Sequence, residues 1–311
     1  MRLILSLLLF ISFSSFSQKE YAKTILDTLC SEHFDGRGYV NNGDVRAADF
    51  IVEELKSIGV QSFKKQSFTQ EYSFSVNSFP YPIEVVLGED TLKPGADYLV
   101  NAISGTAQGD FEVIEINAKN YQDVYHGRIN FKMLDPAQTI FAFNFLGSKN
   151  KELLKEINAL SYEATKYFPV ITTTASKQMY SVGRMHTNYP LISIDSAAYK
   201  TVKTASIKIT NKFIPNYTSK NVIGLIPGKK KKKYVVFSAH YDHLGRMGTE
   251  AMFPGANDNA SGVAMLLSLA KHYMQNKPKY SIVFCFFSGE EAGLLGSNYF
   301  VNHPYFPLKK V

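Results

Sequence analysis

From Asn221 to Val311 the sequence alternates between short continuous apolar runs and longer segments whose apolar residues recur at helical spacing. The apolar runs predict strands and the helical spacing predicts helices. The strands are expected at Val222–Ile226, Val235–Ala239 and Ile282–Phe287, and the helices at Ser261–Met274 and Ala292–Val301. A strand that is apolar on both faces has to be covered on both faces. This region therefore predicts an α/β fold in which a mixed central sheet is flanked by helices on both faces.

The region before Asn221 has a different pattern. Helical spacing predicts helices at Tyr21–Leu29 and at Arg46–Ile58, the second of which stops at Gly59. Short β-type runs follow at Tyr72–Val76, Ile83–Leu87, Phe111–Ile116, Phe168–Thr172, Pro190–Ile194 and Ala205–Ile209, with a helix at Lys151–Tyr167. We therefore expect a discontinuous domain over 18–78 and 214–311, with an α+β or mostly β insert over 79–213.

The first seventeen residues have the pattern of an export signal. Arg2 is followed by an apolar run of eleven residues, Leu3–Phe13, and by a serine-rich stretch that ends at Ser17. Eleven residues are too few to cross a bilayer core of about 30 Å as a helix. We expect residues 1–17 to be a cleaved signal peptide, so the protein is exported, periplasmic or secreted, with no stable membrane span.

The small number of cysteines and the position of the basic residues argue against a disulfide-rich protein, a thiolate metal site and a nucleic-acid-binding protein. Cys30 and Cys285 are too few for a disulfide framework or a thiolate metal site, and the apolar run around Cys285 predicts a buried, unreactive thiol. The net charge of +7 owes much to Lys229–Lys233, which follow Pro227 and Gly228. This run is predicted to be a solvated turn between strands, and we expect no nucleic-acid partner.

Polar residues follow the predicted strands at the positions where ligands collect in such sheets. His240 comes directly after one strand, Glu290 and Glu291 follow another, and Asp258 precedes a helix. An imidazole, a single carboxylate and a carboxylate pair are the ligand types of a two-metal hydrolytic site. Asp242 could accept the second ring N–H of His240 and so orient it.

Each of these elements also has a structural interpretation. Asp258 could cap the following helix, and Ser288 with Glu291 could form a capping box. The Arg of the turn Asp35–Gly38 could be structural or could line a cleft.

Four segments in this order resemble the zinc-dependent peptidase family M28, whose members are largely aminopeptidases with two co-catalytic zinc ions. They are Asn221–Gly224, Ala239–Gly245, Gly255–Gly262 and Gly289–Gly293. The N-terminal helices with Asp35–Gly38 resemble the opening segment of the family, and the insert is similar to its protease-associated domain.

The resemblance implies a peptide substrate and a role for each site residue. His240 would bind one zinc ion, Glu291 the other, and Asp258 would bridge them. Glu290 would be the general base and Asp242 would orient His240. The resemblance also implies a cis peptide bond between Asp258 and Asn259.

In the family each zinc takes one further protein ligand, from a part of the fold that would follow Val311. His303 comes too early and is expected at the surface. On this basis we expect a C-terminally truncated chain that retains zinc weakly and has little activity. Two alternatives stay open: a carboxypeptidase or mono-zinc glutaminyl cyclase-like enzyme, and a non-catalytic binding module on the same fold.

Overall fold

The computed structural model describes residues 18–63, 67–125 and 133–311, which form two compact units. The first unit comprises the described residues of Met1–Phe74, Thr218–Gly245 and Phe253–Val311. The second comprises Ser75–Tyr217 and Arg246–Met252. The predicted export signal, residues 1–17, lies outside the described residues.

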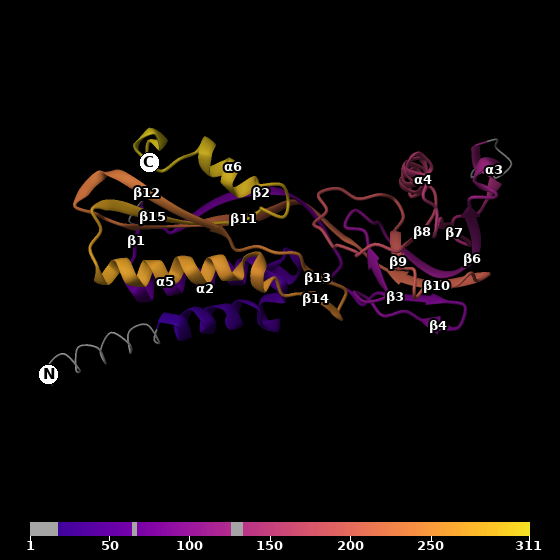
Figure 1. The fold of residues 1–311 in the computed structure, drawn as a ribbon, viewed down its shortest axis with the longest axis horizontal. Coiled ribbons are helices and arrows are strands. Elements are labelled where there is room, and N and C mark those ends of the chain that lie inside the picture. The colour runs from indigo at the N-terminus through magenta and orange to yellow at the C-terminus, as the bar shows by residue number, and fades with distance from the viewer. Residues whose placement is uncertain (1–17, 64–66, 126–132) are drawn as a thin grey trace. The chain divides into compact units, whose positions relative to one another are not determined.

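The first unit is built on a mixed five-stranded sheet (Figure 1). Its strands are β1 (Gln61–Ser62), β2 (Thr69–Ser78), β11 (Lys212–Ile226), β12 (Lys230–His240) and β15 (Tyr280–Phe287). β11 pairs antiparallel with β15, β12 pairs parallel with β15, and β2 pairs with β11. Because β12 and β15 are parallel, their carboxyl ends lie at the same edge of the sheet.

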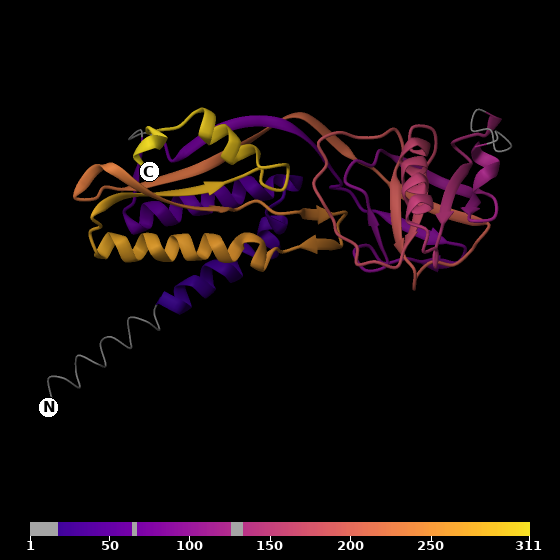
Figure 2. The ribbon, with the colours of Figure 1, turned by 45° about the horizontal axis from the view of Figure 1, so that its top comes forward.

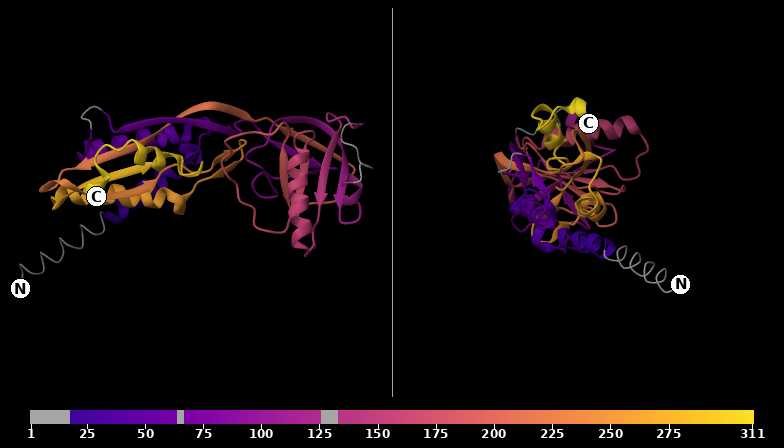
Figure 3. Two further views of the ribbon diagram at one scale, coloured as in Figure 1. Left: turned by 90° about the horizontal axis from the view of Figure 1, so that it is seen from above. Right: turned by 90° about the vertical axis from the view of Figure 1, so that its left-hand side faces the viewer.

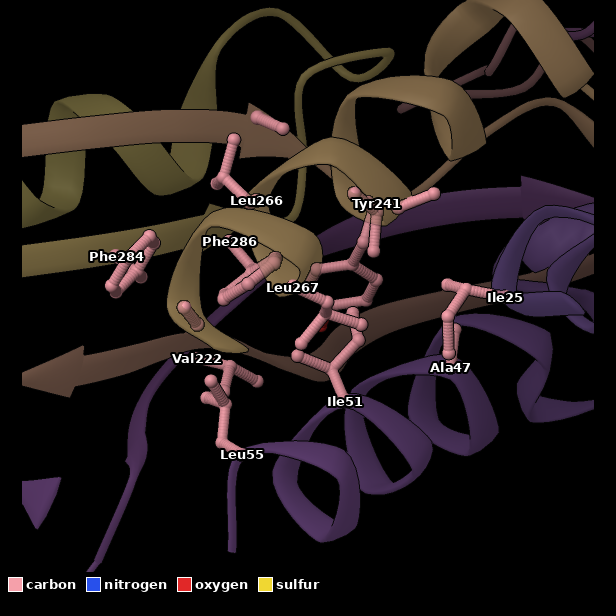
Figure 4. Packing of buried hydrophobic residues seen from close by; sticks show 14 of the residues in the cluster. Ile25, Ala47, Ile51, Leu55, Val222, Tyr241, Leu266, Leu267, Phe284 and Phe286 are labelled. Atoms are coloured by element: carbon pink, nitrogen blue, oxygen red, sulfur yellow. The ribbon is translucent and has the colours of Figure 1, made fainter. Parts of the chain in front are cut away.

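Helices cover both faces of this sheet, as the sequence predicts. The helices α2 (Gly43–Ile58) and α5 (Ser261–Gln275) lie on one side and α6 (Leu295–Asn302) on the other (Figure 2). Successive side chains of β15 point to opposite faces. Phe284 and Phe286 pack against Leu55 and Leu267 of the helices (Figure 4). Val283 and Cys285 pack on the other face, against Phe300 and Phe306, with which they form one cluster.

Most predicted elements of the first unit are confirmed. A helix spans 18–29, and α2 ends at Gly59, whose φ of 89° is the left-handed conformation that glycine adopts at helix ends. Two short turns, η1 (Glu32–Arg37) and η2 (Val40–Asn42), connect these helices. Cys285 is fully buried, and burial raises the pKa of its thiol to about 12, which agrees with an unreactive side chain.

The second unit is an eight-stranded mixed sheet with helix α4 (Lys151–Ala164) alongside it (Figure 3). Its strand order is β4 (Asp90–Thr91), β3 (Glu84–Leu87), β10 (Thr204–Ile209), β6 (Ala107–Asn117), β7 (Thr139–Asn144), β8 (Val170–Thr174), β9 (Leu191–Asp195) and β5 (Tyr98–Val100). Ile157 of α4 packs on Phe141, Phe143 and Val170. The remaining elements are the short helix α3 (Tyr121–Tyr125), the paired strands β13 (Gly245–Met247) and β14 (Ala251–Phe253), and the short helical turns η4 (Ala256–Ala260) and η5 (Leu308–Lys310).

The prediction that the lysine run forms a turn is wrong. Lys230–Lys233 belong to β12, and the turn is confined to the preceding residues Pro227–Lys229. β12 lies at one end of the strand order in the described sheet, and these four lysines are exposed. Lysines on an edge strand hinder pairing with another chain, so they are compatible with strand structure there.

Among the residues that the structure describes, no helix has both the length and the apolar character needed to cross a membrane.

Candidate metal centre

The candidate site lies at the edge of the first unit's sheet where β12 and β15 end. His240 is the last residue of β12 and pairs in register with Phe287, the last residue of β15. The parallel pairing therefore places the two following loops side by side. The segment before α5, which carries Asp258, is the third element at this edge.

Three of the predicted ligands come together here. One ligand atom from each of His240, Asp258 and Glu291 lies within 4.8 Å of the other two. His240 Nε2 lies 3.0 Å from Asp258 Oδ1. An imidazole nitrogen and two carboxylates at this spacing suit a zinc ion, which takes nitrogen and oxygen ligands.

His240 is oriented with one ring nitrogen toward this cluster. Its Nδ1 lies 3.1 Å from the backbone carbonyl oxygen of Asp242, so Nδ1 carries the proton that it donates. Its Nε2 faces Asp258 and is the nitrogen left for a metal ion, which would replace the proton that Nε2 donates to this carboxylate when no metal is bound. Burial lowers the pKa of His240, but the hydrogen bond and the charge of Asp242 outweigh burial and raise the pKa to about 9.

Asp242 connects two of the loops. Its side chain is fully buried, and its Oδ1 lies 3.7 Å from His240 Nδ1. The same carboxylate accepts hydrogen bonds from the backbone N–H groups of Glu290 and Glu291, each at 3.3 Å, and from the Tyr39 hydroxyl at 2.6 Å. Asp242 therefore holds the loop that carries the acids, in addition to its position beside His240.

The capping-box interpretation of the acidic loop is wrong. α6 begins at Leu295 rather than at Ala292, and residues 288–294 form a turn. Ser288 instead forms a buried hydrogen bond between its Oγ and that of Ser219, at 2.7 Å. Because no helix starts there, Glu290 and Glu291 project from a loop that is anchored at its first residue.

The two acids of this loop have different surroundings. Glu291 Oε1 lies 2.6 Å from His243 Nδ1, and the side chain is 16 % exposed. Burial raises the pKa of Glu290, and the charges of Glu291 and Asp242 add to this effect, whereas the charge of His240 lowers it. A carboxyl group whose pKa is raised in this way is a candidate for proton transfer.

Asp258 is not the cap of α5. Its side chain is 64 % exposed and lies against His240. The side chain of Asn259 accepts the hydrogen bond from the backbone N–H of Gly262, at 3.0 Å, near the start of the helix. The peptide bond between Asp258 and Asn259 is cis, as the resemblance implies.

Replacing Asn259 with Ala should lower the free energy of unfolding by about 1 kcal/mol, because an unpaired N–H is left at the start of α5. Denaturant unfolding monitored by circular dichroism would measure the change. Asn276, whose side chain bonds to a carbonyl at the exposed end of the same helix, is the matched control. Asn276→Ala should change the free energy by less than about 0.5 kcal/mol. An equal effect of the two substitutions would contradict the assigned cap.

Sequence reasoning missed two residues at this edge, His243 and Tyr39. His243 contacts Glu291, and Tyr39 contacts Asp242. Arg37 is fully buried and donates to backbone carbonyls, which decides in favour of the structural alternative for this side chain. No spacing rule joins Tyr39 to Asp242, because they are 203 residues apart in the chain. His303 is exposed, as expected.

Comparison with known proteins agrees with this geometry. Residues 221–311 match the model of peptidase family M28. Aminopeptidase YwaD of Bacillus subtilis is 36 % identical over 119 residues, which are 37 % of this chain and 24 % of that protein. A probable zinc metalloprotease of Pyricularia oryzae is 45 % identical over 80 residues, which are 25 % of this chain and 16 % of that protein. The matches thus span about a quarter or less of the length of these relatives.

Solved structures extend the likeness to nearly the whole chain. A zinc aminopeptidase from Bacillus subtilis superimposes with a TM-score of 0.60 at 18 % identity, covering 94 % of this chain and 66 % of that one. A peptidase M28 precursor from Shewanella amazonensis gives a TM-score of 0.56 at 16 % identity, covering 95 % of this chain and 72 % of that one. At these identities the comparison shows that the fold is shared.

Proposed function

We propose that the chain, whose residues 221–311 match the model of peptidase family M28, is a zinc-dependent exopeptidase that releases N-terminal residues from peptides. The observation that carries the proposal is the convergence of His240, Asp258 and Glu291 at one edge of the sheet. The aminopeptidases among its relatives support the choice of the N-terminus over the C-terminus.

His240, Asp258 and Glu291 would supply part of the ligand set of two zinc ions, with the roles that the family implies. His240 would hold one ion through Nε2, Glu291 would hold the other, and the exposed carboxylate of Asp258 would bridge them. Zinc bound here would polarise the scissile carbonyl and make water a stronger acid.

The remaining residues move the proton and keep the geometry. Glu290 would take a proton from the attacking water and deliver it to the departing amine nitrogen. The backbone of Glu290 is held by Asp242, so its position is fixed relative to His240. The free α-amine of the substrate would lie near the ligand carboxylates, which favours cleavage after the first residue.

The proposal predicts a chelator-sensitive aminopeptidase activity. A form of the protein that is active on chromogenic amino-acid amides should lose that activity in a zinc chelator and regain it when zinc is added back. The reason is that zinc polarises the scissile carbonyl and activates the attacking water. Release of the chromophore measures both steps. Substrates with a blocked α-amine serve as the control and should not be cleaved. Activity that persists unchanged in the chelator would contradict the proposal.

The same assay separates the alternatives. A carboxypeptidase would instead release the C-terminal residue from peptides whose α-amine is blocked and whose terminal carboxylate is free. A non-catalytic binding module would take up zinc, or none, without releasing any chromophore.

A further inference from the structure

The segment Gly36–Tyr39 contacts two of the three loops that carry the candidate ligands, and Asp242 links it to the third. It belongs to the N-terminal part of the chain, about 200 residues before the first of those loops, and none of its residues is a candidate ligand. All the contacts described below lie within the first unit.

Arg37 joins the first two ligand loops. Its Nε donates to the carbonyl of Tyr241, the residue after His240, at 2.8 Å. Its Nη1 donates to the carbonyl of Pro254 at 2.7 Å and its Nη2 to that of Gly255 at 2.8 Å, just before Asp258. A buried guanidinium is costly unless its donors are satisfied, and its planar fork fixes the directions in which they point. The Arg37 side chain therefore sets the separation of the His240 loop from the Asp258 loop.

Tyr39 reaches the third loop through Asp242. Its hydroxyl, on a side chain that is 4 % exposed, donates to Asp242 Oδ2 at 2.6 Å. The Asp242 carboxylate in turn accepts the backbone N–H groups of Glu290 and Glu291. The hydrogen bond from the Tyr39 hydroxyl limits the rotation of the buried Asp242 carboxylate. The carboxylate oxygens are therefore held in the direction from which the two N–H groups donate.

Two glycines allow the segment to approach this closely. A Cβ atom on Gly36, whose φ is +60°, would lie 2.4 Å from the Phe253 carbonyl oxygen. A Cβ atom on Gly38 would lie 2.3 Å from Gly245 Cα. Real Cβ atoms essentially never come this near to backbone, so the two positions need glycine for the segment to fit against the His240 loop.

We propose that the Gly36–Tyr39 segment fixes the relative positions of the three ligand loops, with Arg37 and Tyr39 as positioning residues for the metal centre. The inference rests on the proposed function, because it assigns the segment a role toward zinc. If the segment had a purely structural role, removing these contacts would lower the stability of the fold without a specific loss of zinc affinity.

Tyr39→Phe tests the proposal with the smallest change in volume. Titration calorimetry with zinc sulfate should show an affinity lowered by about tenfold, the low end for loss of a group that bonds a ligand directly, because Tyr39 acts on the ligands through Asp242. Tyr98→Phe is the matched control, since Tyr98 is a fully buried tyrosine of the second unit whose hydroxyl has no hydrogen-bond partner among the described residues. It should leave zinc affinity within about twofold of the unmodified protein, because it alters no group near the ligands.

Hydrogen exchange of the Glu290 and Glu291 amides, measured without metal, tests the same link independently. Tyr39→Phe should speed exchange at these two amides by about tenfold, because the acceptor of their hydrogen bonds becomes free to rotate, whereas Tyr98→Phe should not. Arg37→Lys keeps the charge but cannot span the carbonyls of Tyr241 and Gly255, so it should weaken zinc binding at least as much as Tyr39→Phe. If Arg37→Lys does not fold, the Tyr39→Phe results decide.

The outcomes separate the two proposals. Zinc binding by the unmodified protein, with unchanged affinity and exchange in Tyr39→Phe, would overturn the inference and leave the proposed function standing. If the unmodified protein takes up no zinc at all, the proposed function fails, and the exchange comparison still decides whether the segment positions the acidic loop.

Discussion

Replacing Glu290 with Gln should reduce the turnover of an active form of the protein by about 10²- to 10⁴-fold and leave zinc affinity nearly unchanged. The amide has the size and shape of the carboxylate but cannot accept a proton from water, and general base catalysis contributes about this factor. The backbone N–H of residue 290 can still donate to Asp242, so the loop should keep its position. Steady-state kinetics on an amino-acid amide, together with zinc titration, would measure the two effects.

The adjacent acid provides the matched control. Glu291→Gln is the same chemical change one residue later, but Glu291 lies in the ligand cluster. This variant should lower zinc affinity as well as turnover. Turnover in Glu290→Gln equal to that of the unmodified protein would contradict the assigned base. Zinc loss in Glu290→Gln as large as in Glu291→Gln would mean that Glu290 is a ligand.

Replacing Asp258 with Asn should weaken zinc binding by about 100-fold or more, because a bridging carboxylate contributes to the binding of both ions. The stability of the metal-free protein should change by less than about 0.5 kcal/mol, since the side chain is 64 % exposed. Zinc titration and denaturant unfolding in the presence of a chelator would measure the two quantities.

Asp90→Asn is the control for the loss of one exposed carboxylate. Asp90 pairs with Lys200 and lies in the second unit, so its replacement should leave zinc affinity unchanged. If Asp258→Asn binds zinc as tightly as the unmodified protein, Asp258 is not a ligand. If it unfolds the metal-free protein, the carboxylate has a structural role that its exposure does not indicate.

The strands and helices of the first unit could be predicted because their apolar residues satisfy simple periodicities. The run Ile282–Phe287 is apolar on both faces, and the structure buries both, against α2 and α5 on one side and α6 on the other. β7 was not predicted, although Thr139–Asn144 is mostly apolar and buried and is as long as the runs that were predicted as strands. The lysine run was misassigned because side-chain charge alone does not distinguish a turn from an exposed edge strand.

The convergence of the candidate ligands could be predicted because strand ends in such sheets converge, and because the motifs resemble those of one family. The residues that support the cluster could not. Arg37 and Tyr39 act through backbone carbonyls and through one buried carboxylate, and backbone partners leave no trace in a sequence. The sequence allows either Asp258 or Asn259 to cap α5, since both residue types cap helices, and only coordinates show that the Asn259 side chain turns toward Gly262.

The central claim is that His240, Asp258 and Glu291 hold zinc together. Crystals of the protein grown with zinc, with diffraction measured on both sides of the zinc absorption edge, would locate the ions directly. The account predicts an anomalous peak at about 2.0–2.2 Å from His240 Nε2 and from a carboxylate oxygen of Asp258, and a second peak beside Glu291 about 3.5–4 Å from the first when both ions are bound. At saturating zinc, the absence of any peak between these three side chains, or zinc bound only at surface histidines such as His303, would contradict it.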